Sequence, residues 1–400
     1  MLLHRTNLLS SIAQTKQAKA FLVVSSCVLV LLVSSCSHRA EVNSAAYNEV
    51  VPNTLAQSYT PYFQVGAAVN RDHVTGQNPR GAAIVTEHFS VLTAENDMKW
   101  ESVQPREGEF TFNGADALVR YSAKTNQDVI GHVLVWHSQT PDWVFEDENG
   151  KPASRELLLK RMRTHIFEVA GRYRHDIKGW DVVNEALNED GSLRDSKWLQ
   201  IIGDDFIDKA FEYAAQAAPD AELYYNDYNL YKASKMDGAI ALAQRLRKKG
   251  IRIDGIGLQA HYDTSPPLKE LEISIQRVIK ANLKVMITEL DLSVLKFPDE
   301  ENMGADVSLN FEFKDEYNPY VNSISESSSQ RLGQAYIDLF TLFLKYHEHI
   351  DRVTLWGVTD ENTWRNTWPM KGRTDYPLLF DRDYQPKWFV SDLIDLAQAQ

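Results

Sequence analysis

The sequence predicts an α/β protein of the (β/α)8 TIM barrel class, formed by one domain. From residue 61 onward, short apolar runs alternate with longer amphipathic ones, and there are eight such pairs. Alternating strands and helices pair into a parallel sheet with the helices outside, and eight units close it into a barrel. A doubly wound open sheet is the alternative, but no Gly-rich phosphate turn follows the first predicted strand.

The eight predicted strands are short and apolar, and in chain order they cover residues 63–69, 91–98, 129–136, 177–186, 223–229, 253–262, 285–292 and 353–359. Between the predicted strands, apolar residues recur at the spacing of one helix face. Examples are Leu158, Met162, Ile166 and Val169, and farther on Phe206, Ala210, Phe211 and Ala214. The one long irregular stretch, residues 296–330, is expected to be the loop after the seventh strand, and loops of this length usually serve function or are mobile.

The first 35 residues have the pattern of an export signal. Arg5, Lys16 and Lys19 precede an apolar run at residues 21–33, which is short for a bilayer span and typical of the apolar core of a signal peptide. Residues 1–35 are therefore predicted to be a signal peptide that is removed from the mature protein.

Cys36 ends the segment Val33-Ser34-Ser35-Cys36, which resembles a bacterial lipobox. We therefore expect cleavage before Cys36 and attachment of lipid to it; a plain secretory signal is the alternative. Ser37 replaces the aspartate that usually retains lipoproteins in the inner membrane, so an outer-membrane lipoprotein held only by its lipid is expected. Small polar residues predict a linker over 36–56, followed by the barrel domain over 57–400.

Charge and histidine spacing exclude some classes of ligand. The formal net charge is -13 with no compensating basic patch, which argues against nucleic acid and suits a neutral substrate. His132, His137 and His261 form no i, i+4 helical pair and have no Cys partner, so no metal site and no cofactor are expected. We expect a monomer, although no sequence feature defines the oligomeric state.

Polar residues gather at the ends of the predicted strands. "KGWDVVNEAL" (178–187) ends its apolar run in Asn184 and Glu185, and "KVMITELDLS" (284–293) leads into Glu289 and Asp291. The C-terminal ends of barrel strands form the rim that carries active sites. The fourth and seventh strands stand well apart in an eight-strand ring, so carboxylates on them can face each other across its mouth.

Two carboxylates that flank a cleft can hydrolyse a glycosidic bond, if one stays protonated and the other ionised. His261 is within plausible reach of Glu289 and would keep it ionised. Glu185 follows Val182 and Val183, so desolvation and the second carboxylate are expected to raise its pKa. A single glutamate exposed at a strand end would be unremarkable, but two beside Asn184 and His261 favour catalysis.

Several candidate residues also have a structural interpretation. His132 is as consistent with a hydrogen-bonded core histidine as with a ligand contact. Lys99 and Glu95 have the spacing of a solvated charge pair. Trp136, Trp356 and Trp364, taken singly, fit the core, yet their places at strand ends or in the last loop also suit platforms for sugar rings.

Seven further segments are distinctive, namely "TAENDMKWE" (93–101), "GHVLVWHSQTPDW" (131–143), "WDVVNEA" (180–186), "YYNDYN" (224–229), "GLQAHY" (257–262), "ITELD" (287–291) and "LWGVTDENTW" (355–364). Together they resemble the endo-β-1,4-xylanases of glycoside hydrolase family ten. The match covers about residues 63–389, and the order and spacing of the segments make it specific.

The resemblance implies a retaining enzyme that acts on xylan and xylo-oligosaccharides without a cofactor. Glu185 matches the general acid/base, Glu289 the nucleophile, and Asn184 the residue that contacts the sugar 2-hydroxyl. Because neighbouring strand residues point to opposite faces, the strand must twist or bulge if Asn184 and Glu185 both serve. His261 and Asp291 would orient the nucleophile. Matches to glycone-side positions are Glu95, Asn96, Lys99, His132, Trp136, Gln139, Gln259, Trp356 and Trp364, and Tyr228 matches an aglycone-side position.

Two rival functions remain open at this point. A related barrel hydrolase could use the same glutamates on cellulose or mixed-linkage glucan, and a surface lipoprotein could bind glycans without turnover. The loop that contains "FEFKDEYNPY" (311–320) departs from the family pattern, and we expect it to cover part of the aglycone side of the cleft.

Overall fold

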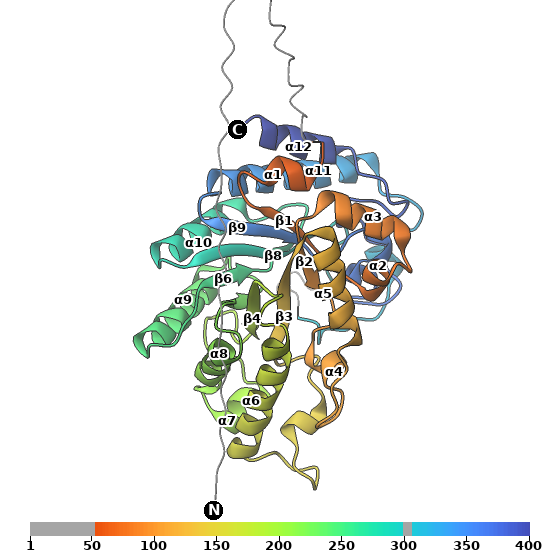
Figure 1. Ribbon diagram of the computed structural model, residues 1–400. Helices are drawn as coiled ribbons and strands as arrows, with labels where there is room; N and C mark the ends of the chain where they lie inside the picture. Colours follow the sequence, from red (N-terminus) through yellow and green to blue (C-terminus); the bar gives the residue numbers. More distant parts are fainter. Residues whose placement is uncertain (1–52, 299–305) are drawn as a thin grey trace, which may run out of the picture. The chain divides into compact units, whose positions relative to one another are not determined.

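The computed structural model describes residues 53–298 and 306–400, which form a closed barrel of parallel strands with helices around it (Figure 1). The strands run in the order β6-β5-β4-β3-β2-β1-β9-β8, and pairing of β8 with β6 closes the ring. The predicted single-domain barrel is thereby confirmed. The predicted signal peptide and Cys36 lie outside the described residues, within which no helix is long and apolar enough to cross a membrane.

The strands follow the predicted order with small changes at their ends. They are β1 Gln64–Val69, β2 Val91–Ala94, β3 Asp128–Trp136, β4 Gly179–Asn184, β5 Glu222–Asp227, β6 Gly255–Leu258, β7 His261–Asp263, β8 Lys284–Ser293 and β9 Ile350–Leu355. The predicted sixth strand is divided into β6 and β7, because Ala260 between them takes a left-handed backbone with φ 63°. Beyond this break β7 pairs with β8, with His261 beside Asp291.

At least one helix precedes each barrel strand after β1, and the apolar helix faces predicted from the sequence are buried. Leu158, Met162, Ile166 and Val169 are buried in α6, and Phe206, Ala210, Phe211 and Ala214 in α8. The helices are α1 Leu55–Tyr59, α2 Arg71–Thr75, α3 Pro79–His88, α4 Trp100–Val103, α5 Asn113–Thr125, α6 Arg155–Arg172, α7 Lys197–Ile202, α8 Phe206–Ala217, α9 Ala233–Lys248, α10 Leu268–Lys280, α11 Glu326–Lys345 and α12 Phe389–Gln398.

Helix α1 begins earlier than the predicted start of the domain at residue 57. The Thr54 hydroxyl accepts a hydrogen bond from the Gln57 amide and so caps the helix. Leu55 and Tyr59 are fully buried, and the Tyr59 hydroxyl donates to the Leu393 carbonyl at 2.8 Å. The last residues of the predicted linker are therefore part of the fold, because they pack against the C-terminal helix.

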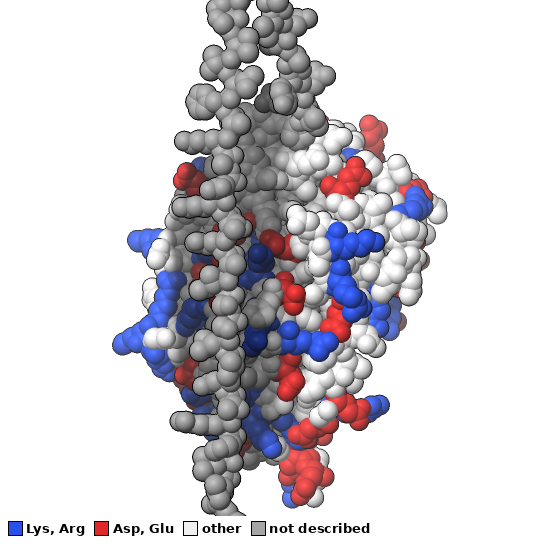
Figure 2. Space-filling view, viewed as in Figure 1, with Lys and Arg blue, Asp and Glu red and all other residues white. Residues whose placement is uncertain are grey.

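Charged side chains are mixed in sign on the surface drawn in Figure 2, where Lys and Arg lie among Asp and Glu. Ion pairs also occur within the described residues; Lys284 Nζ, for example, lies 2.8 Å from Glu222 and 2.6 Å from Asp351.

The long segment between β8 and α11 packs on the segment that follows β9. The Phe311 amide donates to the Pro369 carbonyl at 2.9 Å, and the Tyr376 hydroxyl donates to the Tyr320 carbonyl at 2.9 Å. Its described part thus lies against the segment that carries Trp364, at the same rim as the predicted active site.

Candidate active site

A cavity of about 480 Å³ opens at the C-terminal ends of the strands. β4 and β8, which lead into the two candidate glutamates, have β5 and β6 between them on one side of the ring. The cavity is lined by most of the residues singled out from the sequence, namely Glu95, Asn96, Lys99, His132, Trp136, Gln139, Asn184, Glu185, Gln259, His261, Glu289, Trp356 and Trp364. The structure therefore brings together segments that are scattered along the chain.

Glu185 sits just beyond the end of β4 in a left-handed backbone conformation, with φ 54°. This turn, together with a register shift in the pairing of β4 with β5, lets Asn184 and Glu185 both face the cavity. The Asn184 amide donates to Glu185 Oε1 at 3.2 Å. The expected departure from strict strand alternation is thus confirmed.

Glu185 is only 3% exposed, and its carboxylate is surrounded by hydrogen-bond donors. Trp136 Nε1 donates to one of its oxygens at 2.9 Å, and Gln259 Nε2 donates to the other at 3.0 Å. Burial raises the pKa of Glu185 to about 7, with further contributions from the charges of Asp227 and, to a lesser extent, Glu289. The raised pKa agrees with the sequence-based expectation, but the larger carboxylate contribution comes from Asp227.

Glu289 is buried to a similar extent as Glu185, with 5% of its surface exposed, yet its pKa is lowered. Burial acts to raise this pKa, but hydrogen bonds from His261 and Asn226 and the charges of His132 and His261 outweigh it, so the pKa is lowered. His261 Nε2 lies 3.2 Å from Glu289 Oε2, and Asn226 Nδ2 donates to Oε1 at 2.6 Å. Two carboxylates of similar burial thus have pKa values that are shifted in opposite directions.

Asp291 does not line the cavity and acts through His261. Its carboxylate is fully buried, lies 2.9 Å from His261 Nδ1, and accepts hydrogen bonds from Arg365 at 2.7 Å and Trp364 at 2.7 Å. Burial opposes ionisation, but the charges of Arg365 and His261 lower the pKa of Asp291 to about 2. The permanent negative charge of Asp291 in turn raises the pKa of His261 against the effect of burial. These contacts hold the His261 imidazole toward Glu289.

On the opposite side of the cavity a lysine lies among amides and indole rings. Lys99 Nζ donates to Asn96 Oδ1 at 3.0 Å and to Gln139 Oε1 at 2.7 Å, and lies 5.2 Å from the Trp136 ring centroid and 6.0 Å from that of Trp356. Lys99 is buried, so it is not part of a solvated surface pair. Burial lowers its pKa, an effect that nearby carboxylates oppose.

His132 satisfies both interpretations of its role. Its Nδ1 lies 3.0 Å from the buried Asp181 carboxylate, as in a core histidine, while its ring lines the cavity and packs edge-on against Trp356 at 5.2 Å. The Asp181 carboxylate fixes the orientation of the His132 ring, and another part of the ring faces the catalytic cavity.

Tyr228, the aglycone-side candidate, does not line the catalytic cavity. It is 7% exposed, its hydroxyl accepts a hydrogen bond from Arg194 at 2.5 Å, and Lys235 Nζ lies 3.6 Å from its ring centroid. The tyrosine is therefore covered by cationic side chains.

Three functional residues were missed from the sequence. Asn226 links Glu289 to Asn184, Asp227 acts on the pKa of Glu185, and Arg365 holds Asp291. Asn226 and Asp227 end β5, so their place at a strand end was the signal that could have revealed them. Arg365 lies in a short 3-10 helix, Trp364–Asn366, away from any strand end, and has no such signal.

No group of three or more His, Cys, Asp or Glu side chains that could hold a metal ion occurs in the part of the chain that the structure describes.

The C-terminal rim of this (β/α)8 barrel carries two buried glutamates whose pKa values are shifted in opposite directions. This fold and site define an enzyme of the glycoside hydrolase class. Residues 54–395 match the profile described as "Glycosyl hydrolase family 10". The chain belongs to this family.

Relatives and solved structures agree with this assignment. The chain is 43% identical over 346 residues to endo-1,4-beta-xylanase A of Xylanibacter ruminicola, covering 86% of this chain and 94% of the relative. It is 41% identical to an endo-1,4-beta-xylanase of Geobacillus stearothermophilus, covering 84% and 96%. A GH10 endoxylanase from a sugarcane soil metagenome superimposes with a TM-score of 0.81 at 39% identity, covering 86% of this chain and 99% of that one. A mutant structure in complex with xylotriose gives 0.77 at 37% identity, covering 86% and 99%.

Proposed function

We propose that the protein is an endo-1,4-β-xylanase, which hydrolyses internal β-1,4-xylosidic bonds of xylan and xylo-oligosaccharides with retention of anomeric configuration. The observation that carries this proposal is that two carboxylates in one cavity have pKa values shifted in opposite directions. The pKa of Glu185 is raised to about 7, and that of Glu289 is lowered. The xylanase names of the relatives and the xylotriose complex support the choice of substrate.

In the first step the ionised Glu289 attacks the anomeric carbon while Glu185 gives its proton to the leaving glycosidic oxygen. The product with the new hydroxyl leaves, and a covalent glycosyl ester of Glu289 remains. Glu185, now ionised, takes a proton from water, which attacks the same carbon and regenerates Glu289. Two inversions give net retention.

The surrounding groups prepare both carboxylates for these steps. Asn226 donates to Glu289 and also to Asn184 Oδ1, at 2.9 Å, so one amide network spans the two catalytic residues. Hydrogen bonds favour the ionised form of Glu289, which is the nucleophile, and burial favours the protonated form of Glu185, which is the acid. Flat indole faces of Trp136 and Trp356 beside Lys99 suit a stacked sugar with polar hydroxyls at its edge.

Product release from xylan, cellulose, mixed-linkage glucan and mannan, measured in parallel with the soluble domain that begins after Cys36, tests this function. We expect short xylo-oligosaccharides to accumulate from xylan. Release mainly from glucan would support the same mechanism with a different substrate. Tight binding to glycans without turnover of any of them would indicate a glycan-binding lipoprotein.

The pH dependence of kcat/KM should be bell-shaped. Glu185 must be protonated, so the rate should fall about tenfold per unit as pH rises beyond about 7. Glu289 must be ionised, so the rate should fall on the acid side only below the ordinary glutamate range, because its pKa is lowered. A rate that still increases from pH 7 to pH 9 would contradict the acid role of Glu185.

Replacing Asp227 by asparagine should move the alkaline limb of this profile to lower pH. The negative charge of Asp227 disfavours ionisation of Glu185, so its removal lowers the pKa of Glu185, by about half to one pH unit. Asparagine keeps an oxygen acceptor for Lys235, which lies 3.0 Å from Asp227 Oδ1. Thermal unfolding is the control, and an unmoved or upward-shifted limb in a folded variant would contradict the assignment.

We propose further that the protein is exported as an outer-membrane lipoprotein with lipid on Cys36 and acts as a monomer. The lipobox-like segment before Cys36 and the serine after it support this. Labelled palmitate should enter the wild-type protein and not the Cys36→Ala variant. Equal labelling of both proteins, or of neither, would reject the lipoprotein, and protease treatment of whole cells would identify the membrane face.

A further inference from the structure

The lining of the catalytic cavity includes a charged side chain to which the mechanism assigns no role. Apart from the histidines, the charged residues of this lining are Glu95, Lys99, Glu185, Glu289 and Glu361. Glu361 alone among these five is exposed, since the other four are buried or half-buried. It follows β9, in the short 3-10 helix Asp360–Asn362. Because it is exposed and also lines the cavity, Glu361 lies at the mouth of the cavity.

Neighbouring side chains hold the Glu361 carboxylate in place. The Tyr384 hydroxyl donates a hydrogen bond to Glu361 Oε2, and Asn78 Nδ2 donates to the Tyr384 hydroxyl at 3.0 Å. The backbone carbonyl of Glu361 accepts a hydrogen bond at 3.1 Å from Asn366, which also lines the cavity. The tyrosine is a neutral donor, so it fixes the carboxylate without cancelling its charge.

Two cations in this region have other partners. Arg80 lies over the face of the Tyr384 ring, 4.4 Å from its centroid, and donates to the Asp383 carbonyl. Lys99, the one lysine of the cavity lining, is buried and donates to Asn96 and Gln139. Among the described residues of the lining, the exposed charge is therefore negative only.

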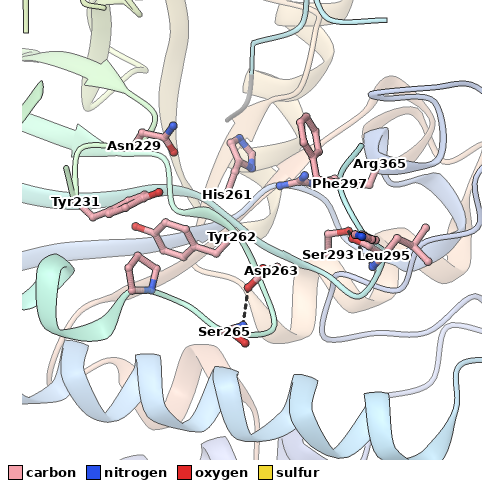
Figure 3. A pocket seen from close by; sticks show the side chains of 12 residues that line it. Asn229, Tyr231, His261, Tyr262, Asp263, Ser265, Ser293, Leu295, Phe297 and Arg365 are labelled. Carbon is pink, nitrogen blue, oxygen red and sulfur yellow. Dashed lines mark hydrogen bonds between the residues drawn. The ribbon is translucent and has the colours of Figure 1, made fainter. Parts of the chain in front are cut away.

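The second cavity near the active site differs in this respect. It has a volume of about 520 Å³ and shares His261 with the catalytic cavity. Figure 3 shows both Asp263 and Arg365 at this second cavity, and Lys296 lines it as well. Charges of both signs thus line the second cavity, whereas a lone exposed carboxylate marks the mouth of the catalytic one.

We propose that Glu361 is a specificity determinant that disfavours xylan with uronic acid side chains, so that the enzyme selects neutral stretches of the polymer. This inference rests on the proposed function and narrows its substrate class. A uronic acid carboxylate that approaches the cavity mouth is repelled by the carboxylate of Glu361, because like charges a few ångströms apart at a protein surface interact unfavourably. A neutral sugar meets no such repulsion. Glu361 acts on the choice of substrate and takes no part in bond cleavage.

The test compares kcat/KM on a xylan with uronic acid side chains before and after chemical reduction of its carboxyl groups to alcohols. The side chains of the two polymers are similar in size and differ in charge. The wild type should favour the reduced polymer about three- to tenfold. Glu361→Gln removes the charge but keeps an oxygen acceptor for Tyr384, so its ratio of reduced to native polymer should fall to within about twofold of one.

Glu148→Gln is the matched control, because Glu148 is an exposed glutamate that lines neither cavity. Its ratio should equal that of the wild type. Ionic strength provides a test without mutation, since raising it from about 0.01 M to about 1 M shortens the Debye length from about 30 Å to about 3 Å. The wild-type ratio should then approach one, and the ratio of Glu361→Gln should change little.

Equal kcat/KM of the wild type on both polymers, or a preference for the native one, would overturn this inference alone. A preference that persists unchanged in Glu361→Gln would also overturn it, because another group would then be its cause. Absence of turnover by the wild type on every xylan would overturn the proposed function and the inference together.

Discussion

Glu289→Ala should lose essentially all turnover of xylan, on the order of 10⁵-fold in kcat. The covalent step has no substitute nucleophile, because the neighbouring carboxylate of Asp291 is fully buried and committed to His261, Arg365 and Trp364. The measurement is initial-rate release of reducing sugar from xylan by the purified variant.

Azide distinguishes loss of the nucleophile from loss of the fold. A small anion that enters the space left by the side chain can attack the anomeric carbon of an activated aryl xylobioside once, which would give the glycosyl azide of inverted configuration. Glu87→Ala, which removes an exposed glutamate from α3, should keep wild-type activity. Failure of azide to restore any product from a correctly folded variant, or an azide product of retained configuration, would count against Glu289 as the nucleophile.

Glu185→Ala should show a loss that depends on the leaving group. Protonation of the leaving oxygen contributes about 10²- to 10⁴-fold, and xylan needs all of it because its leaving group is a sugar hydroxyl. A dinitrophenyl xylobioside needs little protonation, so its glycosylation step, measured as the burst of phenolate, should be affected much less. The alkaline limb near pH 7 should also disappear, because the group that titrates there is removed.

Equal loss of the burst rate and of xylan turnover would contradict the acid role of Glu185. Gln259→Ala is a useful companion, since it removes a hydrogen bond to Glu185 without removing the carboxyl. That bond favours the ionised form, so its loss should raise the pKa of Glu185 and shift the alkaline limb upward.

The barrel and its catalytic pair were predictable because both follow from local patterns. Strand period, helical stripes and the placement of polar residues at strand ends are properties of short segments, and the closed parallel ring follows from eight repeats of them. The break at Ala260 was not predictable, because a left-handed alanine has no sequence signature, and tertiary contacts hold His261 beside Asp291.

The sequence by itself determined the fold class and the placement of the two glutamates at strand ends, because alternation and strand-end position assign residues to faces and rims, and the resemblance to glycoside hydrolase family ten implied most of the cavity lining. Only the tertiary structure decided that Asp227 acts more strongly on Glu185 than Glu289 does, that Arg365 holds Asp291, and that Arg194 donates to Tyr228. These effects depend on distances of a few ångströms between residues far apart in the chain. Electrostatic and hydrogen-bond energies depend steeply on those distances and on burial, which no local pattern encodes.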